Sequence, residues 1–178
     1  MSKDNHTIRS VYPREVVEGR IRELAARINA DYAGKPLVVV CVLKGAYMFF
    51  SDLVKELTVG PELDFVRLAS YGNGIESSRS ISFTKDVELS LAGKHVLLVE
   101  DVIDTGHTMD FLIRQLKARG AVSLKIAALI DKKARREVPV DAEYVGFTVN
   151  DGFIIGYGLD YAERYREIPA ICEVVFDA

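Results

Sequence analysis

Three short runs of apolar residues limit the possible folds of this chain more than any other feature of its sequence. The runs Leu37–Leu43 and Val96–Val99 are continuous, and Leu124–Ile130 is interrupted only by Lys125. All three lack the alternation of polar and apolar residues found in a half-exposed strand. Such runs are typical of strands that are buried on both faces, as in a parallel sheet covered by helices. We therefore predict three buried parallel strands within one sheet.

Helical patterns separate these runs. Apolar residues recur at intervals of three and four over about Pro13–Asp31, over Ala46–Leu57 and over about Thr108–Arg119. A strand, a helix and a further strand in this order imply βαβ units with right-handed crossovers. The chain is therefore expected to adopt an α/β fold.

Further strands are expected at the margins of this sheet. Leu63–Ser70 is one candidate, and Ser80–Glu88 could add short antiparallel strands. Between them, Tyr71–Arg79 is rich in glycine and serine and has no apolar period, which indicates a mobile loop.

The last third of the chain is less regular. Tyr144–Val149, Phe153–Ile155 and Ile171–Phe176 look like short strands around a glycine-rich segment. They are too short to form a second domain. We expect one domain over residues 1–178, with the segment from about 144 to 178 forming a small cap on the main sheet.

Composition and charge narrow the functional classes. The chain has 178 residues and a net charge of −3, which argues against general binding to nucleic acid. No apolar stretch approaches the roughly 20 residues of a membrane helix, and Met1–Ser10 lacks the apolar core of a secretion signal. Cys41 and Cys172 sit in apolar runs, as expected of buried, reduced thiols. These features predict a cytoplasmic protein.

The strand Val96–Val99 is followed by an acidic segment. Glu100 and Asp101 come first, and Asp104 follows after two apolar residues. In open parallel sheets, ligands bind beyond the carboxyl ends of the strands. Adjacent carboxylates repel each other, but the two neighbouring hydroxyls of a ribose could both donate hydrogen bonds to such a pair.

A phosphate-binding turn is expected next. Residues 105–108 read Thr-Gly-His-Thr and open a helix, where unpaired backbone amides and the helix dipole favour an anion. Each residue alone is equally typical of an acidic loop with a helix cap, with or without a metal. The complete order favours a site for ribose 5-phosphate.

The segment Val99–Thr108 resembles the phosphoribosyl pyrophosphate motif of type I phosphoribosyltransferases. The resemblance covers nearly the whole chain and is greatest for the bacterial hypoxanthine-guanine branch. The other matching segments are Val42–Ala46, Ser70–Gly72, Asp131–Lys133 with Arg135–Arg136, and Gly156–Tyr161. The resemblance implies a mostly parallel central sheet that is flanked by helices and carries a small hood.

The resemblance also implies an activity in purine salvage. It is the Mg²⁺-dependent transfer of a phosphoribosyl group from phosphoribosyl pyrophosphate to hypoxanthine, and also guanine, which forms IMP or GMP and pyrophosphate. Mg²⁺ would be bound mostly by substrate and water, with Glu100, Asp101 and Asp160 as the protein's contribution. A homodimer or homotetramer is expected on the same basis.

By this resemblance, Asp104 is the general base near N7 of the purine, although a purely electrostatic role is an open alternative. Glu100 and Asp101 bind the ribose hydroxyls. Thr105, Gly106, His107 and Thr108 form the cradle for the 5-phosphate, with the backbone amide of His107 as its contribution.

The pyrophosphate and the purine have their own expected residues. Lys44 and Gly45 match the pyrophosphate loop, with a cis peptide between Leu43 and Lys44, and Arg166 and Arg136 match arginines on the pyrophosphate side.

Lys132 would donate to the 6-oxo group of the purine, Phe153 would stack on the ring, and Ile154 would offer backbone groups to its edge. Asp160 is expected in the same purine pocket. Ser70 and Tyr71 would begin a lid that excludes water. A solvated basic turn is the alternative interpretation of the lysines and arginines around Lys132.

Other functions are considered as alternatives. A xanthine-preferring enzyme would need only small changes in backbone contacts, whereas Lys132 argues against adenine. A non-catalytic nucleotide sensor of the same fold is disfavoured by the presence of Asp104 and by the negative charge. A dinucleotide-binding enzyme is disfavoured because no G-x-G-x-x-G follows the first strand.

Overall fold

The computed structural model describes residues 6–71 and 80–176. Its main sheet has six strands in the order β4-β3-β2-β5-β6-β7, and all neighbours are parallel except the pair β3 and β4. The α/β fold with a mostly parallel sheet is therefore confirmed. The strands are β2 (Leu37–Leu43), β3 (Glu62–Tyr71), β4 (Ser80–Lys85), β5 (His95–Ile103), β6 (Ser123–Asp131) and β7 (Tyr144–Thr148).

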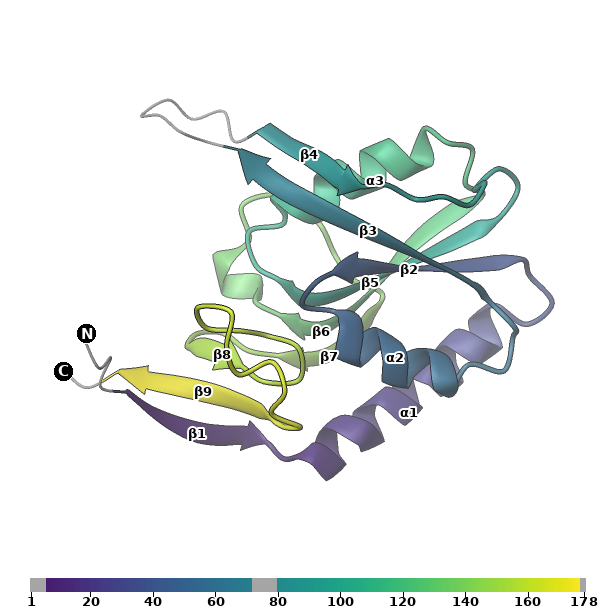
Figure 1. Ribbon diagram of the computed structural model, residues 1–178. Coiled ribbons are helices and arrows are strands. Elements are labelled where there is room, and N and C mark those ends of the chain that lie inside the picture. The colour runs from purple at the N-terminus through teal and green to yellow at the C-terminus, as the bar shows by residue number, and fades with distance from the viewer. Residues whose placement is uncertain (1–5, 72–79, 177–178) are drawn as a thin grey trace.

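Three helices cover the two faces of this sheet. In Figure 1, α1 (Arg14–Asp31) and α2 (Tyr47–Lys55) lie on one face and α3 (His107–Lys117) lies on the other. Alternate residues of β2 point to opposite sides: Val39 packs in the core under α1 and α2, and Val40 packs in the core under α3. Both faces of the strand are thus shielded from water, which explains its continuous apolar sequence.

The hood is a separate antiparallel sheet in the order β1-β9-β8. Its strands are β1 (His6–Tyr12), β9 (Ile171–Phe176) and β8 (Phe153–Ile155). The sequence-based prediction missed one strand and misplaced another. The first strand of the chain was not predicted, because most of its side chains are polar and exposed. The segment Tyr144–Thr148 was expected in the cap, but it joins the main sheet through parallel pairing with β6.

The strand β5 also extends further than expected. It was expected to end at Val99, but pairing with β6 continues, with Glu100 opposite Ala128 and Ile103 opposite Asp131. The first two acids of the motif therefore belong to a central strand, and the turn begins at Asp104.

At the other side of the sheet, β3 ends at Ser70 and Tyr71, whose backbones pair with Ile81 and Ser80. The loop predicted beyond them lies almost entirely in residues 72–79, outside the described part of the chain.

Both cysteines are free and buried, as predicted, one in each sheet. None of the helices in the described residues combines the length and apolar character needed to span a membrane.

Candidate functional site

Two cavities share a wall at the carboxyl end of β5. The first, of about 270 Å³, is bounded by the end of β2, the acids of β5 and the turn before α3. The second, of about 450 Å³, lies between the end of β6 and the hood. Asp101, Val102 and Asp104 line both cavities. Predicted ribose-phosphate residues lie around the first cavity, and predicted purine residues lie around the second.

The acid pair lies at the base of the first cavity. Glu100 is only 6% exposed, and burial, with a further contribution from Asp101, raises the pKa of its carboxyl group well above the usual value. The carboxylate of Asp101 lies directly against Gly45, so a Cβ at Gly45 would clash with it unless the carboxylate moved. The predicted pyrophosphate loop and the predicted ribose acids are therefore in contact.

Asp104 stands where the two cavities meet. Its Oδ1 lies 3.2 Å from Nε of Arg135, but no group in the described residues makes a hydrogen bond with this oxygen. A buried carboxylate oxygen without a donor is a strong acceptor. The hydrogen-bonding capacity of this oxygen is therefore unused within the described residues, although the Arg135 guanidinium lies beside it.

The turn between β5 and α3 forms another wall of the first cavity. Thr105, Gly106 and Thr108 line it, and Gly106 has φ of 93°, a left-handed conformation that favours glycine. The side chain of His107 is not part of this lining. Its Nε2 lies 2.8 Å from a carboxylate oxygen of Glu137 on the protein surface.

The second cavity contains one buried cation and one exposed aromatic ring. Lys132 is 8% exposed, and its Nζ donates a hydrogen bond of 2.7 Å to the carbonyl oxygen of Gly152, while burial lowers its pKa. Phe153 is 43% exposed and makes an edge contact with Tyr161, with ring centroids 5.3 Å apart. Ile154 and the acid predicted at position 160 complete the wall.

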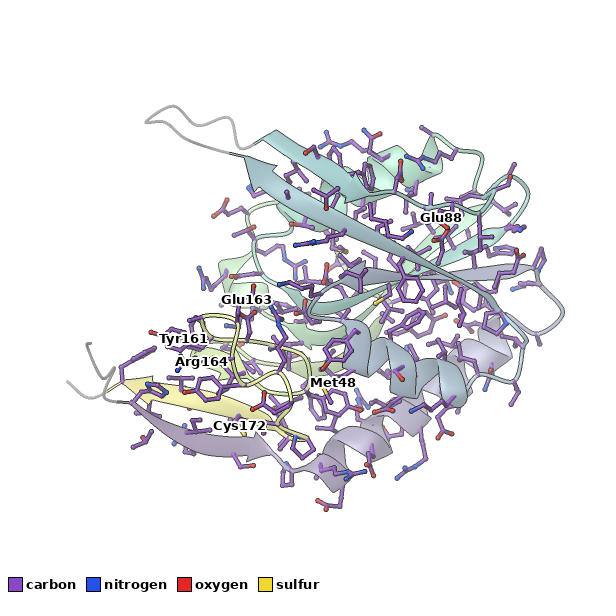
Figure 2. All side chains as sticks on the ribbon, viewed as in Figure 1. Met48, Glu88, Tyr161, Glu163, Arg164 and Cys172 are labelled. Carbon is purple, nitrogen blue, oxygen red and sulfur yellow. The ribbon has the colours of Figure 1, made fainter. Side chains whose placement is uncertain are left out.

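A cluster of ion pairs joins the hood to the end of β2. Nζ of Lys44 donates to Oε2 of Glu163 at 2.6 Å, and Arg166 lies 2.7 Å from a carboxylate oxygen of Asp160 and 3.4 Å from Glu163. Figure 2 labels Glu163, which belongs to the hood loop between β8 and β9. The hydrogen bond from Lys44 lowers the pKa of the Glu163 carboxyl group.

The pyrophosphate loop itself has the expected backbone. The peptide bond between Leu43 and Lys44 is cis. The backbone of Gly158 packs so closely on the carbonyl group of Gly45 that no side chain could be placed at Gly158. The hood loop, the pyrophosphate loop and the acid pair are thus tightly packed together.

Comparison with known proteins identifies this arrangement. Residues 9–162 match the family model of the phosphoribosyl transferase domain. The chain belongs to the phosphoribosyltransferase family.

Curated relatives and solved structures extend this result. The chain is 41% identical over 172 residues to the hypoxanthine phosphoribosyltransferase of Escherichia coli strain K12, with 96% of this chain and 97% of that protein covered. It is 44% identical to the bifunctional protein TilS/HprT of Listeria innocua, of which it spans 26%. A hypoxanthine-guanine phosphoribosyltransferase structure from Bacillus anthracis matches with a TM-score of 0.89 and 37% identity, covering 96% and 99% of the two chains.

Several residues of this phosphoribosyltransferase site were not found by sequence reasoning. Arg135 faces the predicted base, and Glu163 bridges Lys44 and Arg166. Their only sequence signal is charge, which does not specify a partner. Arg136 was expected on the pyrophosphate side, but its guanidinium lies beneath the turn, pairs with Asp131 and is absent from the lining of both cavities.

The acids of the phosphoribosyltransferase site provide only carboxylate oxygens, the donors that Mg²⁺ prefers. Asp101 and Asp160 line the same cavity, and Glu100 lies beside Asp101. Within residues 6–71 and 80–176, no three potential ligand side chains lie close enough to enclose a metal. Glu100, Asp101 and Asp160 are thus the carboxylates of the described residues at the junction of the two cavities that were predicted to contact Mg²⁺.

Proposed function

We propose that this chain is a purine-salvage pentosyltransferase, which transfers the phosphoribosyl group of phosphoribosyl pyrophosphate to hypoxanthine, and also to guanine. The observation that carries the proposal is the position of Asp104. Its carboxylate lies between a cavity with ribose-phosphate residues and a cavity with purine residues, and Oδ1 has no hydrogen-bond partner among the described residues. A base that serves a purine and a sugar must lie at such a junction.

In the first cavity, the ribose would be bound by the acid pair. Its two hydroxyl groups would donate to the carboxylates of Glu100 and Asp101, and its 5-phosphate would accept from the backbone amides and hydroxyls of residues 105–108. These contacts would fix the anomeric carbon close to Asp104.

In the second cavity, the purine would lie against Phe153. An ammonium group has three donor hydrogens, and Lys132 uses one of them for the carbonyl of Gly152. A second could bind the 6-oxo group, whereas a 6-amino group would offer this cation no acceptor. Ile154 would contribute backbone groups to the other edge of the ring.

Asp104 would accept the N7 proton of the purine as the glycosidic bond forms. The same carboxylate would stabilise the positive charge that develops on the sugar when pyrophosphate departs. Lys44, Gly45 and Arg166 would bind the leaving pyrophosphate, which would have to replace Glu163 as the partner of both cations.

Mg²⁺ would be bound through water or substrate by Glu100, Asp101 and Asp160. Its chemical contribution is to neutralise the negative charge on the pyrophosphate group. The residues of this chain would orient the substrates around it and exclude water.

The remaining features stay predictions. Ser70 and Tyr71 would lead into a lid that protects the reacting carbon from water, because their strand ends close to Ile81, a residue of the first cavity wall. A cytoplasmic location and a homodimer or homotetramer are expected from the family.

A direct assay tests the proposal. The full chain is incubated with Mg²⁺, phosphoribosyl pyrophosphate and one purine at a time: hypoxanthine, guanine, xanthine or adenine. We expect nucleotide formation with hypoxanthine and guanine, and none without Mg²⁺. Absence of turnover with every purine would refute the enzymatic function. A preference for xanthine would show that the chain is the xanthine-preferring enzyme considered as an alternative. A preference for adenine would contradict the role of Lys132.

A further inference from the structure

The backbone carbonyls at the turn after β5 are all anchored on the same side. The carbonyl oxygen of Ile103 accepts from the backbone amide of Lys132 at 2.9 Å, and that of Thr105 accepts from the amides of Glu137 and Val138 at 2.9 and 3.0 Å. The carbonyl between them, of Asp104, accepts instead from a side chain. One segment, residues 132–138, therefore supports three consecutive peptide groups.

The side chain that completes this series is Arg136. Its Nε donates to the carbonyl oxygen of Asp104 at 3.1 Å, and its Nη2 contacts the carboxylate of Asp131. The side chain is only 13% exposed, and its Asp131 partner is 1% exposed. Its Cδ also lies 3.0 Å from the position that a Cβ at Gly106 would occupy. Arg136 thus fills the space directly beneath the turn.

Anchoring a carbonyl determines where the next amide points. In a trans peptide the C=O and N–H bonds lie in one plane and point in opposite directions, and the peptide bonds of this turn are not among the cis bonds. With the carbonyls of Asp104 and Thr105 turned toward residues 136–138, the amides of Thr105 and Gly106 point away from that segment. Both residues line the first cavity.

We propose that Arg136 is a positioning residue, which orients the peptide between Asp104 and Thr105 so that its amide can bind the 5-phosphate of the substrate. The inference rests on the proposed function, because it assigns the first cavity to a phosphoribosyl group. Arg136 was expected to contact the pyrophosphate. In this proposal it lies instead beneath the turn that binds the 5-phosphate, at the other end of the substrate.

The chemistry of arginine suits this position. The planar guanidinium presents several donors at fixed angles, so it can reach a carboxylate and a carbonyl at once. Asp131 compensates its charge, and Arg136 therefore acts on the turn as an oriented donor instead of as a free cation. A hydrogen bond to the carbonyl also polarises the peptide and strengthens its N–H as a donor.

The test compares two ligands that differ only in the phosphate. Dissociation constants of IMP and inosine are measured by competition with phosphoribosyl pyrophosphate, for the full-length wild type and for Arg136→Gln and Arg136→Lys. The ratio of the inosine constant to the IMP constant reports the contribution of the 5-phosphate. We expect this ratio to fall by about 10-fold in both variants, because one oriented hydrogen bond near a charged ligand is disrupted.

The matched control is Arg119→Gln, which removes a bidentate ion pair with Asp86 beyond the far end of α3. It should destabilise the chain without changing the ratio. If Arg136→Gln does not fold, Arg136→Lys decides, because it keeps a positive charge beside Asp131.

The two ways in which the test can fail are distinguishable. A large ratio in the wild type that persists in the Arg136 variants would overturn the role of Arg136 alone. A wild-type ratio near one would refute the phosphate site itself, and with it the role of Arg136.

Discussion

The two walls of the site differ in how they are built. On the main sheet, Glu100 and Asp101 belong to a central strand, and the turn that follows is anchored through backbone carbonyls. On the hood side, Ile155, Cys172 and Val174 form a small buried cluster of their own, with a few partly buried neighbours. There, exposed ion pairs link Glu163 to the cations expected to bind pyrophosphate.

This difference separates binding groups that are fixed from groups that change partners. Backbone amides at the end of a buried strand keep their direction whether or not a ligand is present. Exposed ion pairs contribute little stability, and an anion can replace the carboxylate at little cost. The sugar-phosphate end of the substrate therefore meets a preformed surface, whereas the pyrophosphate end meets side chains that must exchange one anion for another.

The largest effect is expected for Asp104→Asn, at the carboxyl end of β5 in the wall formed by the main sheet. The amide cannot accept the purine proton, so kcat should fall on the order of 100-fold or more, while binding of phosphoribosyl pyrophosphate is largely retained. Steady-state kinetics with hypoxanthine measures both. Asp110→Asn is the control, because it removes a surface ion pair with Arg114 on α3 and should leave kcat unchanged. Unchanged turnover in Asp104→Asn would exclude this residue as the base.

A second substitution, Gly106→Ala, disrupts the turn between β5 and α3 directly. Its φ is 93°, and a Cβ would lie 2.9 Å from the carbonyl oxygen of Val138. A strained non-glycine residue costs about 1–3 kcal/mol, so KM for phosphoribosyl pyrophosphate should rise roughly 10-fold or more.

Gly93→Ala is a matched control for this substitution. Its φ is also positive, at 76°, but a Cβ there would meet no atom within 4 Å. It should lower the melting temperature without changing KM. Equal effects of the two substitutions on KM would contradict a specific role of the turn.

The labelling rates of the two buried cysteines allow the local stability of the two regions to be compared. Cys41 lies in the main sheet, where burial and the nearby acids raise its pKa to about 12, and Cys172 lies in the hood, where burial also raises the thiol pKa. Neither should react quickly at neutral pH, and labelling should report local opening.

We expect Cys172 to be labelled faster by a thiol reagent, with sites and rates followed by mass spectrometry. A difference of about 1.4 kcal/mol in opening free energy would produce a tenfold difference in rate. Single-cysteine variants with alanine at the other position are the controls. Faster labelling of Cys41 would reverse the proposed order of stability.

The smallest effect is expected for Glu163→Gln. Without its charge, this side chain would compete less with pyrophosphate for Lys44 and Arg166, and the inhibition constant of pyrophosphate should fall roughly 2- to 5-fold, the range expected for exposed ion pairs. Glu62→Gln, which removes an exposed pair with Lys94, should leave it unchanged. Weaker pyrophosphate inhibition would show that Glu163 positions the two cations instead of competing for them.

The sequence predicted the central strands β2, β5 and β6 because they are largely buried on both faces, and burial leaves a clear apolar pattern. The strand β1 was not predicted because its side chains are mostly polar and exposed, and because its partner strand lies almost at the other end of the chain. The end of β5 was misplaced because acidic residues are unusual in a central strand, and here a ligand site explains them.

The site was predicted less completely than the fold. The motif around Asp104 has a fixed local order, so the acids and threonines that line the first cavity could be named in advance. The partners of Arg136 and Glu163 could not, because they depend on how distant segments meet. In the hood loop, Ala162, Glu163 and Tyr165 adopt positive φ values that no sequence pattern of non-glycine residues indicates.

The order of strands in the hood has a consequence for biosynthesis. The middle strand, β9, is the last strand of the described chain, while its neighbours β1 and β8 are made earlier. In Figure 1 the first and last described strands lie side by side. On the ribosome, β1 therefore stays unpaired within this sheet until its partner β9, the last of the elements, has emerged. The nascent chain can complete its phosphate-binding turn early, but the wall that receives the purine closes only with the final strand.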